Sequence, residues 1–129
     1  MKWKIAELEA GDHIRVKRDY YYHHGVYIGN DTVVHFTGPE NDSISKPNEV
    51  KVMKTSIDFF AKDGVVEKAF PSVAELFFVR NKKEAIKNAI QCIGNGNYDF
   101  LHNNCEDFAN YCCYKKKLTS QIEKIKESI

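Results

Sequence analysis

One cysteine in this sequence stands where a loop is expected to give way to a helix. Cys105 follows Asn103 and Asn104, and asparagine is a favoured helix cap. Behind it, Phe108 and Cys112 recur at helical spacing. A thiol in this position lies among unpaired backbone N–H groups at the positive end of a helix dipole, and both favour the thiolate. Cys105 is therefore a candidate nucleophile, provided that a base lies near it.

The candidate bases are three histidines far upstream, on segments that read as strands. Residues 23–29 and 32–36 flank a compact two-residue turn and are predicted to form a hairpin. Because side chains alternate along a strand, His23 and His35 are predicted to lie near each other across the sheet. One histidine would then deprotonate the thiol, and the other would orient that first histidine. This is the arrangement of an acyl-transfer triad. His24 points to the other face and is the alternative base, which the strand register disfavours.

The elements that must position these groups come as strands first and helices last. Alternating or β-branched residues predict further strands over 13–17, 50–54 and 65–69, with a short helical hook at 56–61 and an ambiguous segment at 77–79. Helical spacing predicts helices over residues 82–93, about 104–115 and from 119 onward. This order predicts an α+β fold, with an antiparallel sheet of about four to six strands followed by C-terminal helices.

Composition narrows the class of protein. The 129 residues are most simply one domain, and 19 basic against 18 acidic residues leave a net charge of +1, so nothing indicates nucleic acid as a partner. The four cysteines have no metal-finger spacing and are predicted to be reduced thiols, with Cys92 and Cys112 as buried structural residues. No segment resembles a signal peptide or the roughly 20 apolar residues that span a bilayer. A cytoplasmic protein without a metal or cofactor is expected.

Two segments resemble the lecithin:retinol acyltransferase-like family. Residues 23–29 (HHGVYIG), followed by 33–36 (VVHF), resemble its histidine box, and residues 98–112 (YDFLHNNCEDFANYC) resemble its asparagine–cysteine motif. Gly11-Asp12 is similar to the family's opening strand motif. The motifs occur in the family's order and cover about residues 8–116. The resemblance therefore predicts a single domain of this type over residues 1–129, with a C-terminal helix over 117–129.

The resemblance implies both a fold and a chemistry. The fold would be that of a circularly permuted relative of the papain-like and NlpC-type cysteine hydrolases, in which the cysteine helix follows the sheet. Family members take an acyl chain from a phospholipid onto a cysteine as a thioester, then pass it to water, an amine, a lysophospholipid or retinol. Carried over, Cys105 would be the nucleophile, His23 the general base and acid, and His35 the polar third member that fixes His23. The Cys105 backbone N–H would form part of an oxyanion hole, and the partner would be an acyl donor such as a phospholipid or thioester.

Two departures from the family keep alternatives open. Position 24 is histidine, where many animal members carry an aromatic residue. Animal enzymes of the family usually end in a hydrophobic anchor, which is not seen here. Lys115–Lys117 and the stripe that follows are a candidate for peripheral contact with a membrane surface, although such stripes more often pack on their own domain; the stripe comprises Leu118, Ile122 and Ile125.

Two further functions therefore remain alternatives. One is a non-catalytic interaction module, as in certain viral proteins that look like this family. The other is an amidase or peptidase closer to the NlpC type. A peptidase is expected to present a polar cleft, whereas a lipid acyltransferase is expected to present an apolar groove beside the thiol.

Overall fold

The computed structural model describes residues 1–40, 47–97 and 104–115. The elements in chain order are β1 (Lys2–Lys4), β2 (His13–Lys17), β3 (Tyr22–Gly29), β4 (Thr32–Thr37), η1 (Pro47–Glu49), β5 (Lys51–Ser56), α1 (Ile57–Ala61), β6 (Val66–Phe70), η2 (Glu75–Phe78), α2 (Lys82–Cys92) and α3 (Cys105–Cys113). The predicted helix over 117–129 lies outside the described residues.

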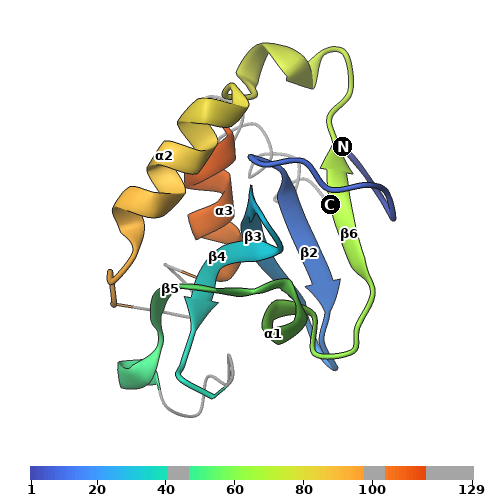
Figure 1. The fold of residues 1–129 in the computed structure, drawn as a ribbon. Coiled ribbons are helices and arrows are strands. Elements are labelled where there is room, and N and C mark those ends of the chain that lie inside the picture. Colours follow the sequence, from blue (N-terminus) through green and yellow to red (C-terminus); the bar gives the residue numbers. More distant parts are fainter. Residues whose placement is uncertain (41–46, 98–103, 116–129) are drawn as a thin grey trace.

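The described strands form one antiparallel sheet. Their order across the sheet is β1-β6-β2-β3-β4-β5, so the histidine-bearing strands β3 and β4 are neighbours near one side. Figure 1 shows α2 and α3 side by side against one face of this sheet, and both helices contact β3. The predicted α+β class is confirmed, and the helix that carries Cys105 follows the sheet along the chain, as the resemblance implied.

Buried residues pack into two cores, one on each face of the sheet. On the face of α2 and α3, Val26 and Val34 pack with Phe108 of α3. On the opposite face, Tyr27 and Val33 pack with the buried ring of Phe60 from α1. Consecutive residues of β3 and β4 thus enter different cores, as the alternation of side chains along a strand requires. The predicted assignment of residues to the two faces is confirmed.

The turn between β3 and β4 fixes which residues of the two strands face each other. Asn30 and Asp31 both have positive φ, at 50° and 53°, the backbone conformation of a tight hairpin turn that Asn and Asp tolerate. The strands then pair Tyr27 with Val33 and Val26 with Val34. Continued by one pair, this register sets the Cα of residue 35 opposite that of residue 25.

Position 25 requires glycine because side chains of β4 and α1 pack directly against it. A Cβ built at Gly25 would lie 2.8 Å from Val33 Cγ1, 2.9 Å from Phe60 Cε2 and 3.2 Å from His35 Cβ. The first two separations are shorter than real Cβ contacts allow. A side chain at this position would therefore push against the histidine of β4 and against the ring of α1.

Replacing Gly25 by alanine is expected to lower the free energy of unfolding by about 1–3 kcal/mol, because overpacking a filled core forces side chains off their rotamers. The matched control is Gly96→Ala, since a Cβ at Gly96 would meet nothing within 4 Å. Urea denaturation of both variants measures the difference. Equal stabilities for the two variants would contradict the close packing at Gly25.

The sequence did not predict three features of the fold. Strand β1 pairs Trp3 with Ala69 of β6, yet three residues that alternate lysine and tryptophan carry no recognisable strand pattern. β6 begins at Val66, one residue later than expected. The ambiguous segment near residue 78 is a 3-10 turn, followed by an isolated bridge between Val79 and Tyr114.

Candidate functional site

Helix α3 begins at Cys105 because the residues on either side of it cap the helix reciprocally. The side chain of Asn104 accepts a hydrogen bond from the backbone N–H of Asp107 at 3.1 Å, and the Asp107 carboxylate accepts one from the Asn104 N–H, also at 3.1 Å. The predicted loop-to-helix junction at Cys105 is confirmed. The thiol therefore sits on the first residue of the helix, where backbone N–H groups have no partner within the helix.

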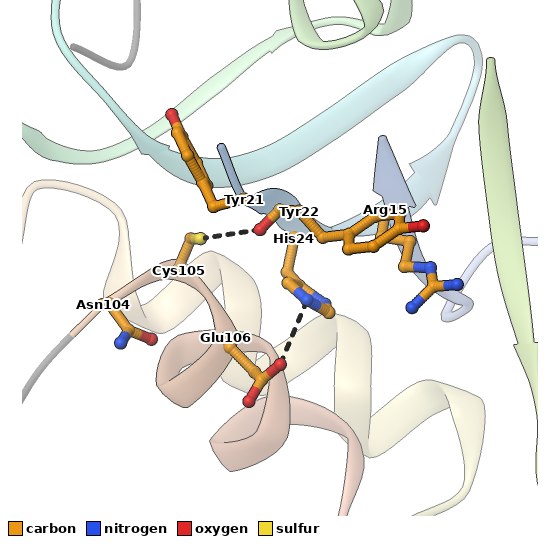
Figure 2. Close-up of a pocket in the computed structure, with 7 residues that line it drawn as sticks. All are labelled: Arg15, Tyr21, Tyr22, His24, Asn104, Cys105 and Glu106. Carbon is orange, nitrogen blue, oxygen red and sulfur yellow. Dashed lines mark hydrogen bonds and ion pairs between the residues drawn. The ribbon is translucent and has the colours of Figure 1, made fainter. Parts of the chain in front are cut away.

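The Cys105 thiol lies against the beginning of strand β3. Its Sγ is 3.9 Å from the carbonyl oxygen of Tyr22, the residue bonded directly to His23, and Figure 2 shows this contact as a dashed line. The residue is 5 % exposed. α3 thus brings a cysteine from late in the chain to the peptide that precedes the first histidine of β3.

His23 and His35 meet on the face of the sheet that packs against α1. The distance between His23 Nε2 and His35 Nδ1 is 2.8 Å, and both side chains are 1 % exposed. The Phe60 ring packs against both imidazoles, with centroid distances of 5.2 Å and 5.0 Å. The predicted proximity of these two histidines is confirmed.

His24 lies on the opposite face, and both of its ring nitrogens have partners. Nε2 is 3.2 Å from a carboxylate oxygen of Glu106, and Nδ1 is 2.8 Å from His13 Nε2. Figure 2 shows His24 and Glu106 reaching toward each other from β3 and α3. Their pairing ties the first turn of α3 to the sheet.

The contact of His24 with His13 extends into a buried chain of polar groups. His13 Nδ1 is 2.8 Å from the Tyr114 hydroxyl, so the chain runs from Tyr114 through two histidines to Glu106. Its members come from β2, β3 and the two ends of α3. The sequence did not predict this chain of contacts, because no local pattern links groups so far apart in the chain.

Burial, followed by the charge that His24 would carry, lowers the pKa of His13 well below its ordinary value of 6.5. His13 then stays neutral in the folded protein at a pH where the unfolded chain already binds a proton. The unfolded state therefore gains protons first, and stability falls as the pH drops below about 6.5.

We expect His13 to contribute a loss of up to about 1.4 kcal/mol of unfolding free energy per pH unit below pH about 6.5. His13→Gln removes that titration while keeping an amide donor for His24. Urea denaturation of both proteins between neutral and acid pH measures the effect. The stability difference between them should shrink on acidification, and a constant difference would contradict a neutral, buried His13.

A pocket of about 260 Å³ opens beside the thiol. It is lined by Arg15, Tyr21, Tyr22, His24, Asn104, Cys105 and Glu106 (Figure 2). The Arg15 guanidinium stacks over Trp3 and Tyr22, 4.4 Å and 3.9 Å from the ring centroids, and its Nε donates to Glu67 at 3.1 Å. The described lining is polar and aromatic, and it contains no aliphatic side chain. The apolar groove expected of a lipid acyltransferase is thus not found among the described residues of this pocket.

The other three cysteines differ from Cys105 in their surroundings. Burial raises the pKa of the Cys113 thiol to about 12, and burial likewise raises the pKa of Cys112 and, less strongly, of Cys92. Cys112 is fully buried in the core between the sheet and the helices, whereas Cys92 is only half-buried. All four cysteines are free thiols. The burial predicted for Cys112 is confirmed, whereas the burial predicted for Cys92 is wrong.

The part of the chain that the structure describes holds neither a cluster of metal-ligating side chains nor a membrane-spanning helix. There, no three histidine, cysteine or acidic side chains come together as a metal site would require. No described helix is both long enough and apolar enough to cross a bilayer. Of the lysine run 115–117 and the apolar stripe considered for membrane contact, Lys115 alone belongs to the described residues.

The start of α3 thus sets Cys105 against the beginning of β3, whose His23 pairs with His35 of the neighbouring strand β4. The chain belongs to the lecithin retinol acyltransferase family, whose model matches residues 6–118.

Individual relatives agree with this assignment. Lecithin retinol acyltransferase of Mus musculus is 27% identical over 147 residues, covering 98% of this chain and 63% of the relative. Protein LEAD-SENSITIVE 1 of Arabidopsis thaliana is 29% identical over 154 residues, covering 83% of this chain and 58% of the relative. The chain therefore spans less than two thirds of the length of these relatives.

Proposed function

We propose that this protein is a thiol-dependent acyltransferase or hydrolase that forms an acyl thioester on Cys105, with a phospholipid as the preferred acyl donor. The observation that carries the proposal is the placement of Cys105, the first residue of α3, 3.9 Å from the carbonyl that precedes the buried His23–His35 pair. Family membership supports acyl transfer in general, and the name of the Mus musculus relative supports a lecithin-type donor for that protein.

In the proposed first half-reaction, His23 takes the Cys105 proton and the thiolate attacks the ester carbonyl carbon. The oxyanion that forms would accept a hydrogen bond from the Cys105 backbone N–H at the start of the helix. The C–O bond then breaks, and the proton on His23 passes to the leaving alcohol. The products are an acyl thioester and a lysophospholipid.

In the second half-reaction, His23 removes a proton from an acceptor hydroxyl, amine or water as it attacks the thioester carbonyl. The C–S bond breaks, and the thiolate recovers its proton from His23. The acyl chain leaves as an ester, an amide or a free acid. Every proton moves between the thiol, the imidazole and the reactants, so the cycle needs no metal or cofactor.

The contacts of His24 favour His23 as the base. A Glu106 carboxylate accepts hydrogen bonds only, so His24 carries its proton on Nε2, and its Nδ1 lone pair is directed at His13. Neither nitrogen of His24 is then placed to take the thiol proton. The Nε2 of His23 is engaged with His35, which makes Nδ1 the nitrogen that would act on Cys105.

The test compares a phospholipid ester, a small acyl thioester and a peptide panel as substrates for the wild-type protein and Cys105→Ala. We expect cleavage or transfer of the ester and thioester, with little action on peptides. Because the described pocket lining is polar, peptide cleavage without lipid turnover is the outcome that would replace this proposal with an amidase. Binding of lipid without turnover of any substrate would point to a non-catalytic module.

A further inference from the structure

The histidine pair on the α1 face of the sheet continues to a threonine. His35 Nε2 lies 2.8 Å from Thr55 Oγ1, so a line of hydrogen bonds runs from His23 on β3 through His35 on β4 to Thr55 on β5. Both histidines are buried, and Thr55 is half-buried. Three neighbouring strands each supply one member of this line.

The hydroxyl hydrogen of Thr55 determines which group donates in each of these hydrogen bonds. A hydroxyl has one hydrogen, and Thr55 donates it to the carbonyl oxygen of Ser56 at 3.1 Å. Towards His35, Thr55 is therefore an acceptor, which requires the His35 proton to be on Nε2. A neutral imidazole has one N–H, so His35 Nδ1 accepts, and His23 must donate from Nε2.

The consequence for His23 is a defined tautomer. With its proton on Nε2, neutral His23 carries its lone pair on Nδ1, the nitrogen on which the proposed base chemistry depends. The ring of Phe60 packs against both histidines and restrains their rotation. If His35 were protonated on Nδ1 instead, it would donate to His23 Nε2, and neutral His23 would then carry its proton on Nδ1, where the lone pair is needed.

We infer that Thr55 is a positioning residue, which holds His35 and, through it, His23 in the tautomers that leave the His23 Nδ1 lone pair for the thiol. This inference rests on the proposed function for its catalytic consequence, but the tautomers themselves are a property of the free protein. When His23 becomes an imidazolium, His35 Nδ1 would accept its Nε2–H without rearrangement. Thr55 thus acts through His35 and does not touch the reacting atoms.

Nitrogen-15 NMR of the imidazoles tests the tautomers without any substrate. At pH about 8.5, where unperturbed histidines are neutral, the wild-type protein should show a protonated Nε2 and an unprotonated Nδ1 in both His23 and His35. Thr55→Val should move a measurable fraction of His35 to the other tautomer. A wild-type His35 protonated on Nδ1, or an unchanged His35 in Thr55→Val, would overturn the inference.

Kinetics test the consequence for catalysis. Thr55→Val should lower kcat by about 5–50-fold with KM unchanged within about twofold, and Thr55→Ser should restore most of it. Valine is favoured in strands, so the variant is expected to fold. Thr32→Val is the matched control, because Thr32 is also half-buried at a strand and its hydroxyl donates to the Asn30 carbonyl, away from the histidine pair.

The two kinds of failure can be told apart. Wild-type kcat in a folded Thr55→Val variant, or equal losses in Thr55→Val and Thr32→Val, would overturn the role of Thr55 while leaving the proposed function in place. Absence of turnover in the wild-type protein would remove the proposed function. The NMR result would still decide whether Thr55 sets the tautomers.

Discussion

Cys105→Ala is expected to lower kcat/KM for an ester or thioester donor by about 10⁴-fold or more, because the proposed reaction has no other route to a covalent intermediate. Cys105→Ser should be nearly as damaging, since a hydroxyl is far harder to ionise than a thiol. The fold should survive both changes, because the helix cap is formed by Asn104 and Asp107 and not by the thiol. Rates with a phospholipid and a thioester, together with urea denaturation, measure the two effects.

The matched control for Cys105→Ala is Cys113→Ala. Cys113 lies on the same helix and is also buried, but burial raises its pKa to about 12. Its loss should change stability more than turnover. A brief treatment with iodoacetamide should likewise modify Cys105 before Cys112 or Cys113, as peptide mass analysis would show. Full activity in Cys105→Ala would remove the nucleophile from the proposal.

The second large effect is expected at His23. Its size, compared with the effect at the adjacent His24, shows which of the two histidines is the base. His23→Gln, which keeps most of the side-chain volume, should lower kcat/KM by about 10³-fold through loss of the general base. His35→Ala should be less severe, because it removes an orienting group and not the base. The pH profile of kcat/KM should lose the ionisation of the essential base in His23→Gln.

His24→Gln is the control for His23→Gln. His24 faces the other core, and its nitrogens are engaged with His13 and Glu106, so we expect a loss of about tenfold or less, arising from a less firmly held α3. The reverse order of effects, with His24→Gln the more damaging change, would show that the base lies on the other face of the strand.

Much of the fold could be predicted because its signals are local. Alternation of side chains placed His23, Gly25 and Tyr27 on one face of β3, and the Asn30-Asp31 turn set the hairpin. The same two facts predicted that His23 and His35 would meet. The cap at Asn104 was recognised, and the acidic residue three positions later was a further signal that would have predicted the reciprocal cap.

The remainder depends on contacts between distant segments, which no local pattern encodes. The pairing of His24 with Glu106 joins a strand to a helix start about eighty residues away, and it requires the helix to be docked before the two groups meet. His13 is an ordinary strand residue by pattern, and its partners become visible only when β2 and α3 are in place. The contact between Thr55 and His35 likewise depends on distant segments, because the pairing of β4 with β5 brings the two residues together.

The polar lining of the pocket indicates which part of a substrate it suits. Arg15 and Glu106 place opposite charges in the walls of the space beside the thiol, and the tyrosines add aromatic surface. These groups suit a polar or zwitterionic part of a substrate better than an acyl tail. The donor is therefore best identified from the group that it leaves on the protein.

Intact-mass analysis after incubation with mixed phospholipids tests the central claim most directly. The wild-type protein should gain the mass of one acyl chain, and hydroxylamine should remove it, as expected for a thioester. Cys113→Ala should acquire the same adduct, and Cys105→Ala should acquire none. An adduct of equal yield on Cys105→Ala, or lipid turnover by the wild-type protein without any acyl adduct on Cys105 under single-turnover conditions, would contradict a thioester mechanism at this residue.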